Sequence, residues 1–575
     1  MLGLNMSKDL ARKILAPSRT IAFRHRSTEH ITEDYIDRTN NVVHSPFSGV
    51  VVPKLNVSDY IWRNSDRWKH WPAVTCAVTG RSFSFCEARA AAERLGIALP
   101  ATLGLRQGDV VGVVMPNMPE YAITFLGLAS AGIIVSPANP LYTAEELARQ
   151  FENCGAKAVV TTPEHFTKVQ EALSKVPGGG GPIVVTTGGP EGNDIFSLDE
   201  LMEREFSRRT PRFDRPDPDS IVALPYSSGT TGLPKGVVIL HRNMVANLCQ
   251  LEHPNVLSFP PHGAPQDVTV GVLPFFHIYG LNGLLNISLS IGRHTITIPK
   301  FEPKVFASIF TKYKPSVLAL VPPLVMYLTQ SELVTSSDLS RVRFISCGAA
   351  PATKSLIEQF MIKANCPDLD FREGYGLTET SCAATFRPSW SGDDKIGSCG
   401  LPVSLTEVKI VDEQGQALTL GQTGELWLRG PQVMQGYFRN EKATKETLTD
   451  DGWLMTGDIA YLDNDGYVFI VDRLKELIKV KGLQVSPTEL EGILRKMDGV
   501  ADVAVLGVPD QRAGEVPKAF VVVKEGSTIA ENDVAAFVEA RVAEFKRLAG
   551  GVKFIKEIPK NAAGKILRKN LKSLL

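Results

Sequence analysis

Hydroxyl, glycine and lysine residues are concentrated between Tyr226 and Lys235, where the chain reads Tyr-Ser-Ser-Gly-Thr-Thr-Gly-Leu-Pro-Lys. The loop follows an apolar run, Ile221–Leu224, which predicts a strand. Backbone N–H groups and hydroxyls at a strand end bind polyanions, and a lysine offsets their charge. The Walker pattern is absent, because Pro234 precedes Lys235 and Gly236 follows it. We therefore predict a non-Walker phosphate-binding loop; the alternative is a flexible Ser/Gly connector.

Five further segments place glycine or other small residues beside chemically active side chains. An aromatic ring can stack a nucleobase, a carboxylate beside phosphates can hold Mg²⁺, and another carboxylate suits a pair of ribose hydroxyls. Taken singly, a histidine among aromatics is usually a packed core residue, and a lysine near a chain end is usually a solvated charge. The segments are Pro274–Gly280, Ser346–Pro351, Glu373–Glu379, Thr456–Asp458 and Pro559–Arg568.

Composition restricts the class of protein. A chain of 575 residues predicts two to four domains. Lys plus Arg and Asp plus Glu both number 62, so there is no bulk positive field for nucleic acid. Eight cysteines without a C-x-x-C pair indicate reduced thiols, neither a disulfide framework nor a zinc site. The longest apolar segment, Ala122–Val135, is too short for a membrane span.

The two ends of the chain bear on localisation. Residues 1–28 contain six basic residues opposed only by Asp9, and an Arg-rich, acid-poor leader of this kind is typical of mitochondrial import. The alternatives are a disordered basic tail and a cytoplasmic protein. The final residues, Lys572–Leu575, do not match the S-K-L peroxisomal address.

Alternating apolar and amphipathic runs predict the elements that must position these motifs. The rhythm indicates an α/β fold with parallel sheets covered by helices, and it returns at residues 317–321 and 343–346. Strands are expected at 109–115, 132–136 and 158–161, and helices at 119–131 and 144–154.

The rhythm changes in the second half of the chain. Short strands with turns at 407–411, 424–429 and 467–471 predict an antiparallel, β-rich subdomain spanning about 400–472. The last hundred residues predict a small α+β domain with strands at 503–508 and 519–523 and a helix at 531–547. The predicted boundary lies near residues 473–476.

From about residue 45 onward, the six segments together resemble the adenylate-forming superfamily. It includes acyl-CoA synthetases, 4-coumarate–CoA ligases, firefly luciferases and peptide-synthetase adenylation domains. The motifs occur in the family's order and spacing, and the nearest similarity is to the 4-coumarate–CoA ligase-like and fatty acyl-CoA synthetase branch. The resemblance implies an N-terminal AMP-binding domain at 45–472, a hinge at 473–475 and a small mobile C-terminal domain at 476–575.

The resemblance also implies a role for individual residues towards ATP, Mg²⁺ and CoA. For the phosphates and the metal, it implies Ser227, Ser228, Gly229, Thr230, Thr231, Gly232, Lys235, Thr378 and Glu379, the last as the Mg²⁺ ligand. For adenine and ribose, it implies Gly348, Ala349, Ala350, Gly374, Tyr375, Gly376, Asp458 and Arg473. For catalysis, it implies Lys565, Lys479, Gln484 and His277, and for the hinge it implies Lys475. For CoA, it implies Lys300, Lys481 and Gly482, and for the acyl pocket it implies Tyr279 and Gly283.

The reaction that the resemblance implies joins a carboxylic acid to CoA. The acid attacks the α-phosphate of ATP, pyrophosphate leaves, and the CoA thiol then displaces AMP. A fatty acid and an aryl-propenoic acid are both compatible substrates, whereas apolar Ile278 argues against an amino acid. Glu373 stands where the family often has Gln, and Val480 where it often has an aromatic residue. The alternatives are a luciferase-like monooxygenase and a non-catalytic protein with the same fold.

Overall fold

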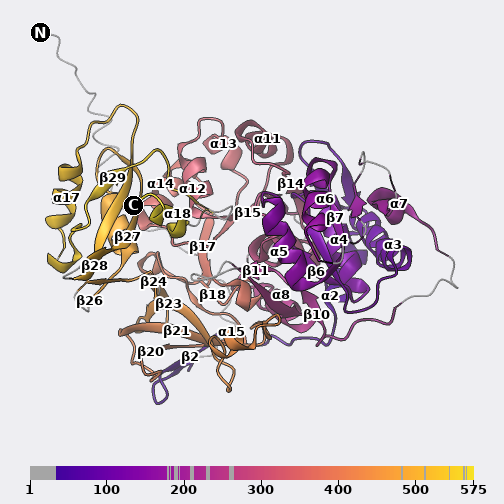
Figure 1. The fold of residues 1–575 in the computed structure, drawn as a ribbon, viewed down its shortest axis with the longest axis horizontal. Coiled ribbons are helices and arrows are strands. Elements are labelled where there is room, and N and C mark those ends of the chain that lie inside the picture. Colours follow the sequence, from indigo (N-terminus) through magenta and orange to yellow (C-terminus); the bar gives the residue numbers. More distant parts are fainter. Residues whose placement is uncertain are drawn as a thin grey trace, which may run out of the picture.

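The structure is a computed structural model. It describes residues 34–177, 181, 183–186, 189, 192, 194–206, 213–227, 234–257, 265–474, 476–480, 483–510, 513–542, 544–560, 564 and 566–575. The basic leader predicted at residues 1–28 lies outside this part of the chain. Within the described residues, no helix is both long enough and apolar enough to cross a membrane. The α/β class predicted from the sequence is confirmed, with a large N-terminal domain and a small C-terminal domain (Figure 1).

The first sheet contains the predicted strand–helix alternation. β5 (Val110–Val114), α4 (Pro119–Ser130), β6 (Ile134–Pro137), α5 (Ala144–Cys154) and β7 (Ala156–Thr161) follow one another, and the three strands pair in parallel. Every residue of β5 is buried, as expected for a parallel strand covered on both faces. The sheet is completed by β8 (Ile183–Val185), β9 (Ile195–Ser197), β10 (Ile221–Ala223), β11 (Tyr226–Ser227), β12 (Lys235–Leu240) and β22 (Gly436–Tyr437).

Helix α5 shows how local sequence sets an element's limits. Thr143 caps its first turn and Glu146 bonds back to the Thr143 N–H, so that two otherwise unpaired donors are satisfied. Gly155 ends the helix with φ +68°, a conformation that glycine adopts without strain. The other helices of this part are α2 (Val57–Trp62), α3 (Phe85–Leu103), α6 (Phe166–Ser174), α7 (Leu198–Glu203) and α8 (His241–Leu251).

The second sheet brings two of the predicted motifs to one edge. β16 (Phe344–Cys347) and β17 (Asp370–Tyr375) are parallel neighbours, so the segments that follow their carboxyl ends lie side by side. The remaining strands are β3 (Pro72–Cys76), β4 (Ser82–Ser84), β13 (Val268–Gly271), β14 (His294–Thr297), β15 (Val317–Leu320), β18 (Thr385–Phe386) and β19 (Leu401–Pro402). The helices are α9 (Ile278–Gly280), α10 (Ile287–Ser290), α11 (Pro303–Tyr313), α12 (Pro322–Gln330), α13 (Ser336–Leu339) and α14 (Lys354–Ala364).

The third sheet is the predicted antiparallel, β-rich part of the large domain. Its strands are β20 (Glu407–Val411), β21 (Thr423–Arg429), β23 (Leu454–Leu462) and β24 (Val468–Arg473). β1 (Ile36–Asp37) and β2 (Val42–His44) extend this sheet through a β2–β20 pair, although they precede the domain start expected at residue 45. Helix α15 (Glu441–Lys445) follows β22.

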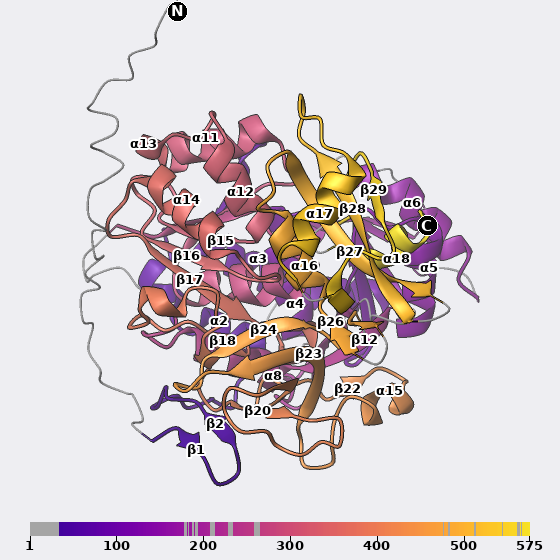
Figure 2. The same ribbon diagram turned by 90° about the vertical axis from the view of Figure 1, so that its left-hand side faces the viewer.

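The small domain is a sheet of β25 (Ile478–Val480), β26 (Leu483–Val485), β27 (Val500–Asp510), β28 (Gly514–Val523) and β29 (Val552–Phe554). Figure 2 shows its sheet and helices packed beside the large domain. The helices are α16 (Pro487–Leu494), α17 (Glu531–Glu539) and α18 (Arg568–Lys572).

One predicted helix of the small domain is too long. The helix expected at 531–547 ends at Glu539, and a separate 3₁₀ turn occupies Glu544–Lys546. The chain folds back because Lys546 pairs with Glu489 of α16 at 2.7 Å, a tertiary contact that a continuous helix could not make.

Candidate active site

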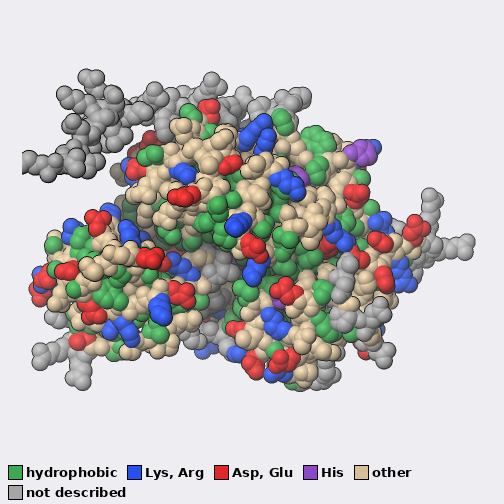
Figure 3. All heavy atoms as spheres, turned by 90° about the horizontal axis from the view of Figure 1, so that it is seen from above, with side chains coloured by type: hydrophobic (Ala, Val, Ile, Leu, Met, Phe, Trp, Pro, Cys, Tyr) green, Lys and Arg blue, Asp and Glu red, His purple; other side chains and the backbone are tan. Residues whose placement is uncertain are grey.

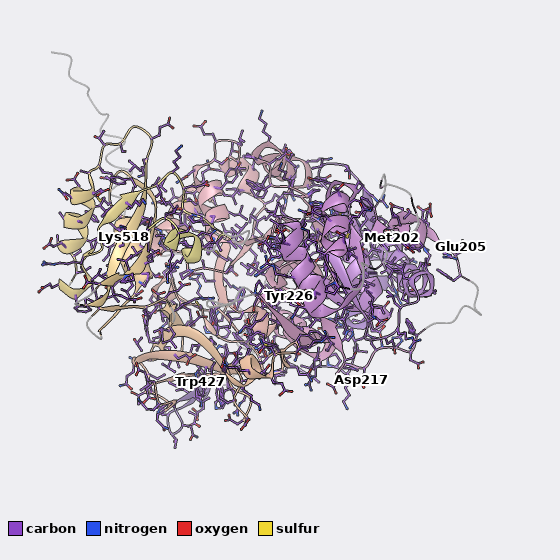
Figure 4. The ribbon with its side chains drawn as sticks, in the orientation of Figure 1. Met202, Glu205, Asp217, Tyr226, Trp427 and Lys518 are labelled. Atoms are coloured by element: carbon purple, nitrogen blue, oxygen red, sulfur yellow. The ribbon has the colours of Figure 1, made fainter. Side chains whose placement is uncertain are left out.

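A cavity of about 1010 Å³ lies between the two domains. Lys560, Leu567 and Asn570 of the small domain contribute to its wall. Tyr226, also in the wall, is labelled near the middle of the molecule in Figure 4, with Lys518 of the small domain on one side and Met202 on the other. The residues implied by the resemblance that line the cavity are Ser227, Lys235, His277, Tyr279, Gly283, Gly348, Ala349, Gly374, Tyr375, Gly376, Thr378, Glu379 and Arg473.

The strands that flank the predicted phosphate loop form a β-hairpin. β11 and β12 pair antiparallel, with Ser227 opposite Lys235 and Tyr226 opposite Gly236. A side chain at Gly236 would lie 3.2 Å from the Tyr226 ring, so glycine gives the ring room. The hairpin agrees with the absence of a Walker strand-to-helix loop. Six residues of the loop, 228–233, lie outside the described residues, and they include the predicted Ser228, Gly229, Thr230, Thr231 and Gly232.

The carboxylate of Glu379 lies against Ser227 of this hairpin and against Tyr437 of β22, the strand that pairs with β12. The Ser227 hydroxyl donates to Glu379 Oε1 at 2.9 Å, and the Tyr437 hydroxyl donates to the same oxygen at 2.9 Å. Lys235 Nζ lies 4.0 Å from the centre of the Tyr437 ring, within cation–π range. Tyr437 therefore contacts both the loop cation and the carboxylate.

A narrow slot lined by backbone lies next to the carboxylate. Gly348 follows β16, and a side chain there would lie 3.2 Å from the Gly374 carbonyl. A side chain at Gly376 would overlap the Cys382 carbonyl at 1.6 Å, so only glycine fits. Ala349 has φ +69°, which an L-residue rarely adopts, and this strain is typical of functional sites. A flat ring can approach the backbone closely here.

Tyr375, Asp458 and Arg473 form one hydrogen-bonded group beside the slot. The Tyr375 hydroxyl donates to Asp458 Oδ2 at 2.5 Å, and Arg473 Nε lies 3.1 Å from Asp458 Oδ1. Asp458 and Arg473 face each other across the β23–β24 pair, which explains how residues fifteen positions apart meet. Burial, followed by the Asp458 charge, raises the pKa of Tyr375 well above its ordinary value. The phenol therefore stays protonated as a donor.

Apolar side chains line another part of the cavity. Tyr279 donates its hydroxyl towards the carbonyls of Leu320 and Ser346, each 3.3 Å away, and burial raises its pKa. A side chain at Gly283 would lie 2.5 Å from Cys382 Sγ, so the wall of the pocket at Gly283 has no room for a side chain. The other members of this group are Leu251, Leu257, Phe276, Ile278, Ala383 and Phe386, none of which is charged.

His277 lies at the edge of the apolar group and caps α9. Its Nδ1 accepts the Tyr279 N–H at 3.3 Å. In the neutral ring the hydrogen therefore lies on Nε2. This geometry suits a side chain that borders the pocket, and the Nδ1 lone pair is already engaged.

The small domain presents its last loop to the cavity. A side chain at Gly564 would lie 2.7 Å from Pro323 at the start of α12, which places this loop against the large domain. Lys565 itself lies outside the described residues, but its neighbours Lys560 and Leu567 line the cavity. From above, the small domain is a lobe at the left of Figure 3, with a furrow between it and the large domain.

Some predicted residues are not among those that line the cavity. Lys300 is exposed and precedes Phe301, whose ring contacts Tyr327 of α12, and Ala350 is half-buried. Lys479 and Gln484 face each other in the β25–β26 pair, and their side chains lie outside the described part. The same holds for three whole residues, Lys475, Lys481 and Gly482. Their roles in CoA binding and hinge motion stay predictions.

A magnesium ion would find few protein ligands here. Among the described residues, no group of three or more His, Cys, Asp or Glu side chains could hold a metal. Glu379 nevertheless suits Mg²⁺, which commonly binds one or two carboxylates together with substrate phosphates and water. Both hydroxyl donors reach Oε1, so neither engages Oε2.

The sequence did not single out Tyr437. No motif marks it, because its significance comes from the pairing of β22 with β12, far away in sequence. Tyr226, whose hydroxyl bonds Asn153 Oδ1 at 2.5 Å, also lines the cavity although only its position beside the loop hinted at a role.

The chain is similar to known proteins over almost its whole length. A family model described as AMP-binding enzyme matches residues 61–438, and one described as AMP-binding enzyme C-terminal domain matches residues 489–565. A relative named 4-coumarate-CoA ligase 1, from Narcissus pseudonarcissus, is 38% identical over 544 residues, which cover 93% of this chain and 96% of the relative.

Solved structures show the same similarity. ATP-bound MatB from Rhodopseudomonas palustris has a TM-score of 0.80 and 28% identity, and the match covers 91% of this chain and 99% of that one. The anthranilate CoA ligase AuaEII in complex with anthranoyl-AMP has a TM-score of 0.79 and 27% identity, with coverage of 91% and 97%.

Proposed function

The chain belongs to the AMP-binding enzyme family, among its ATP-dependent acid–CoA ligases, and we propose that it activates an acid with an uncharged acyl group through an acyl-adenylate. The acyl group is a fatty chain or an aryl-propenoyl group. The observation that carries the proposal is the single cavity in which the nucleotide motifs, the apolar pocket and the last loop of the small domain meet.

In the first half-reaction, a carboxylate oxygen of the acid attacks the α-phosphorus of ATP. The bond between that phosphorus and the bridging oxygen breaks, and pyrophosphate leaves. The phosphate hairpin with Lys235 holds the departing end of ATP, while Arg473 in the cavity wall and its ion-pair partner Asp458 hold the ribose. Two anions must approach each other, so cations that offset their repulsion contribute directly to the rate. Lys565 and a Mg²⁺ on Glu379 supply that charge when both are in place.

In the second half-reaction, the CoA thiol attacks the acyl carbon and AMP leaves. The furrow between the domains gives the thiol an approach, and the segment of Lys479 and Gly482 on the small domain is the face assigned to this step. A hinge at Lys475 lets one domain supply Lys565 first and the thiol channel second.

The character of the acyl pocket supports an uncharged acyl group. The pocket is lined by Leu251, Ile278, Tyr279 and Phe386. Burial of even a neutral polar group against such side chains costs on the order of 2–7 kcal/mol, and burial of a charged group costs more. Proteins similar to this chain include ligases named for 4-coumarate and for anthranilate, both acids that carry an aromatic ring.

Pyrophosphate release tests the proposal. The full-length protein is incubated with ATP, Mg²⁺ and a panel of fatty acids of graded length and aryl-propenoic acids, and thioester formation is then measured after addition of CoA. We expect acid-dependent pyrophosphate release and CoA-dependent AMP release with at least one of these two classes. Turnover confined to dicarboxylic or amino acids would refute the uncharged pocket. Light emission with luciferin in the absence of CoA would instead favour a luciferase-like monooxygenase.

A further inference from the structure

Tyr437 lies where the phosphate hairpin and the carboxylate of Glu379 meet. It belongs to β22, which pairs with β12 so that Tyr437 faces Val237, two residues after Lys235. The segment just before β22 is also bonded to the turn that carries Glu379, because the Met434 N–H donates to the Glu379 carbonyl at 2.8 Å. One short strand therefore ties both parts of the site together through its backbone.

The hydroxyl and the ring of Tyr437 contact different groups. Its hydroxyl donates to Glu379 Oε1 at 2.9 Å, and its ring lies 4.0 Å from Lys235 Nζ. The hydroxyl orients an anion, and the ring's negative face attracts a cation. One side chain therefore contacts both the ammonium of Lys235 and the carboxylate of Glu379.

Tyr437 is held rigidly in this position. It is only 8% exposed, and its N–H donates to Thr444 Oγ1 at 2.9 Å. The hydroxyl is the donor in its bond to Glu379 Oε1. A protonated phenol beside a carboxylate can only donate to it, which fixes the direction of the bond.

We propose that Tyr437 is a positioning residue that presets two groups at once, Glu379 towards the metal of MgATP through its hydroxyl and Lys235 towards the phosphates through its ring. The inference rests on the proposed function for the identity of the ligand, ATP. It assigns the strand β22 a role in nucleotide binding that the motifs alone do not show.

Two substitutions separate the two roles. Tyr437→Phe keeps the ring and removes the hydroxyl, whereas Tyr437→Leu removes both. ATP binding to the full-length protein is measured by calorimetry, once with Mg²⁺ and once with EDTA. We expect Tyr437→Phe to weaken binding about tenfold with Mg²⁺, the usual effect of losing a group that orients a metal ligand, and to leave binding in EDTA within about twofold. Tyr437→Leu should weaken binding in both conditions.

Phe438→Leu is the matched control. Phe438 follows on the same segment, and its side chain packs against a separate apolar cluster that includes Leu224, Val238 and Leu240. This change tests the strand without touching Glu379 or Lys235, and it should leave both affinities unchanged. Equal weakening by Tyr437→Phe with and without Mg²⁺ would overturn the proposal, as would no weakening at all.

A second measurement keeps the test valid where Tyr437→Leu does not fold. The coupling between Tyr437→Phe and Glu379→Gln is determined from the two single variants and the double variant, with MgATP affinity as the readout. We expect the double variant to bind no more weakly than Glu379→Gln alone, and fully additive losses would contradict the assignment. None of these readouts needs an acid or CoA. A protein that binds MgATP as described but ligates no acid would refute the proposed function and leave this inference standing.

Discussion

Arg568 should anchor the last loop of the small domain, the segment that contains Lys565. Its guanidinium bonds Glu476 at 2.7 Å and Glu491 at 2.7 Å, and its Nε bonds the Val505 carbonyl at 3.2 Å. Glu476 follows the hinge, and Arg568 comes three residues after Lys565. The side chain of Arg568 is 14% exposed and that of Glu491 only 3%. We predict that Arg568→Met destabilises the small domain and slows adenylation.

The magnitude follows from the charges that remain. Removal of one partner from a buried ion pair costs about 3–5 kcal/mol. Arg495 still lies 3.5 Å from Glu491, and water can reach Glu476, so we expect the lower end, about 3 kcal/mol. For a unit of roughly 100 residues, each kcal/mol lowers the thermal midpoint by about 4–8 °C. The unfolding transition of the small domain should therefore fall by roughly 12–24 °C.

The pH dependence has a definite sign. Burial raises the pKa of Glu491 above its ordinary value of 4.5, although Arg568 opposes the shift. Without Arg568 the pKa rises further. Between the ordinary pKa and the raised one, the folded state of the variant then holds a proton that the unfolded state has lost. The stability that the variant loses relative to the unsubstituted protein is therefore largest above the raised folded pKa. This loss shrinks as the pH falls towards 4.5, where the unfolded carboxyl is protonated too.

Calorimetric melting of both proteins between pH 5 and pH 8 measures this effect, with Arg547→Met as control. Arg547 pairs with Glu539 on the surface of the same domain, and both side chains are about half exposed, so its loss should cost at most about 1 kcal/mol. A midpoint shift for Arg568→Met no larger than the control's, or a deficit that grows towards pH 5, would refute the reasoning.

Three further predictions concern the two half-reactions and the acyl pocket. Lys565→Ala should abolish acid-dependent pyrophosphate release, whereas thioester formation from a supplied acyl-adenylate survives; loss of both steps would count against a divided site. Gly482→Leu should show the reverse, with adenylation retained and CoA transfer blocked, and unchanged transfer would remove the assigned thiol channel. In Gly283→Ala the new methyl group would lie 2.5 Å from Cys382 Sγ. Overpacking of this kind costs about 1–3 kcal/mol, so kcat/KM for the preferred acid should fall roughly 5- to 150-fold. Cys382→Ala in that background should restore it, and a pyrophosphate assay that shows no rescue would argue against this wall of the pocket.

Local sequence determined most of the elements and the chemical character of the site. The run Val110–Val114 is apolar throughout and can only be a covered strand, and Thr143 with Glu146 sets the start of α5. Glycines that no other residue can replace, such as Gly376 against the Cys382 carbonyl, are recognisable in the sequence as motif positions. These features depend on neighbours along the chain, which is why a sequence reveals them.

Only the tertiary structure decided which distant residues meet. β1 and β2 join a sheet whose other strands begin at residue 407, and no periodicity in a run of two or three residues could predict that pairing. The helix expected at 531–547 ends early because Lys546 pairs with Glu489. The Tyr437 hydroxyl reaches Glu379 across 58 residues, and its ring reaches Lys235 across two hundred. The motifs of the phosphate loop and the acidic turn are properties of the sequence. Their alignment depends on the energy of packing one strand, β22, against another, and that is a property of the folded chain alone.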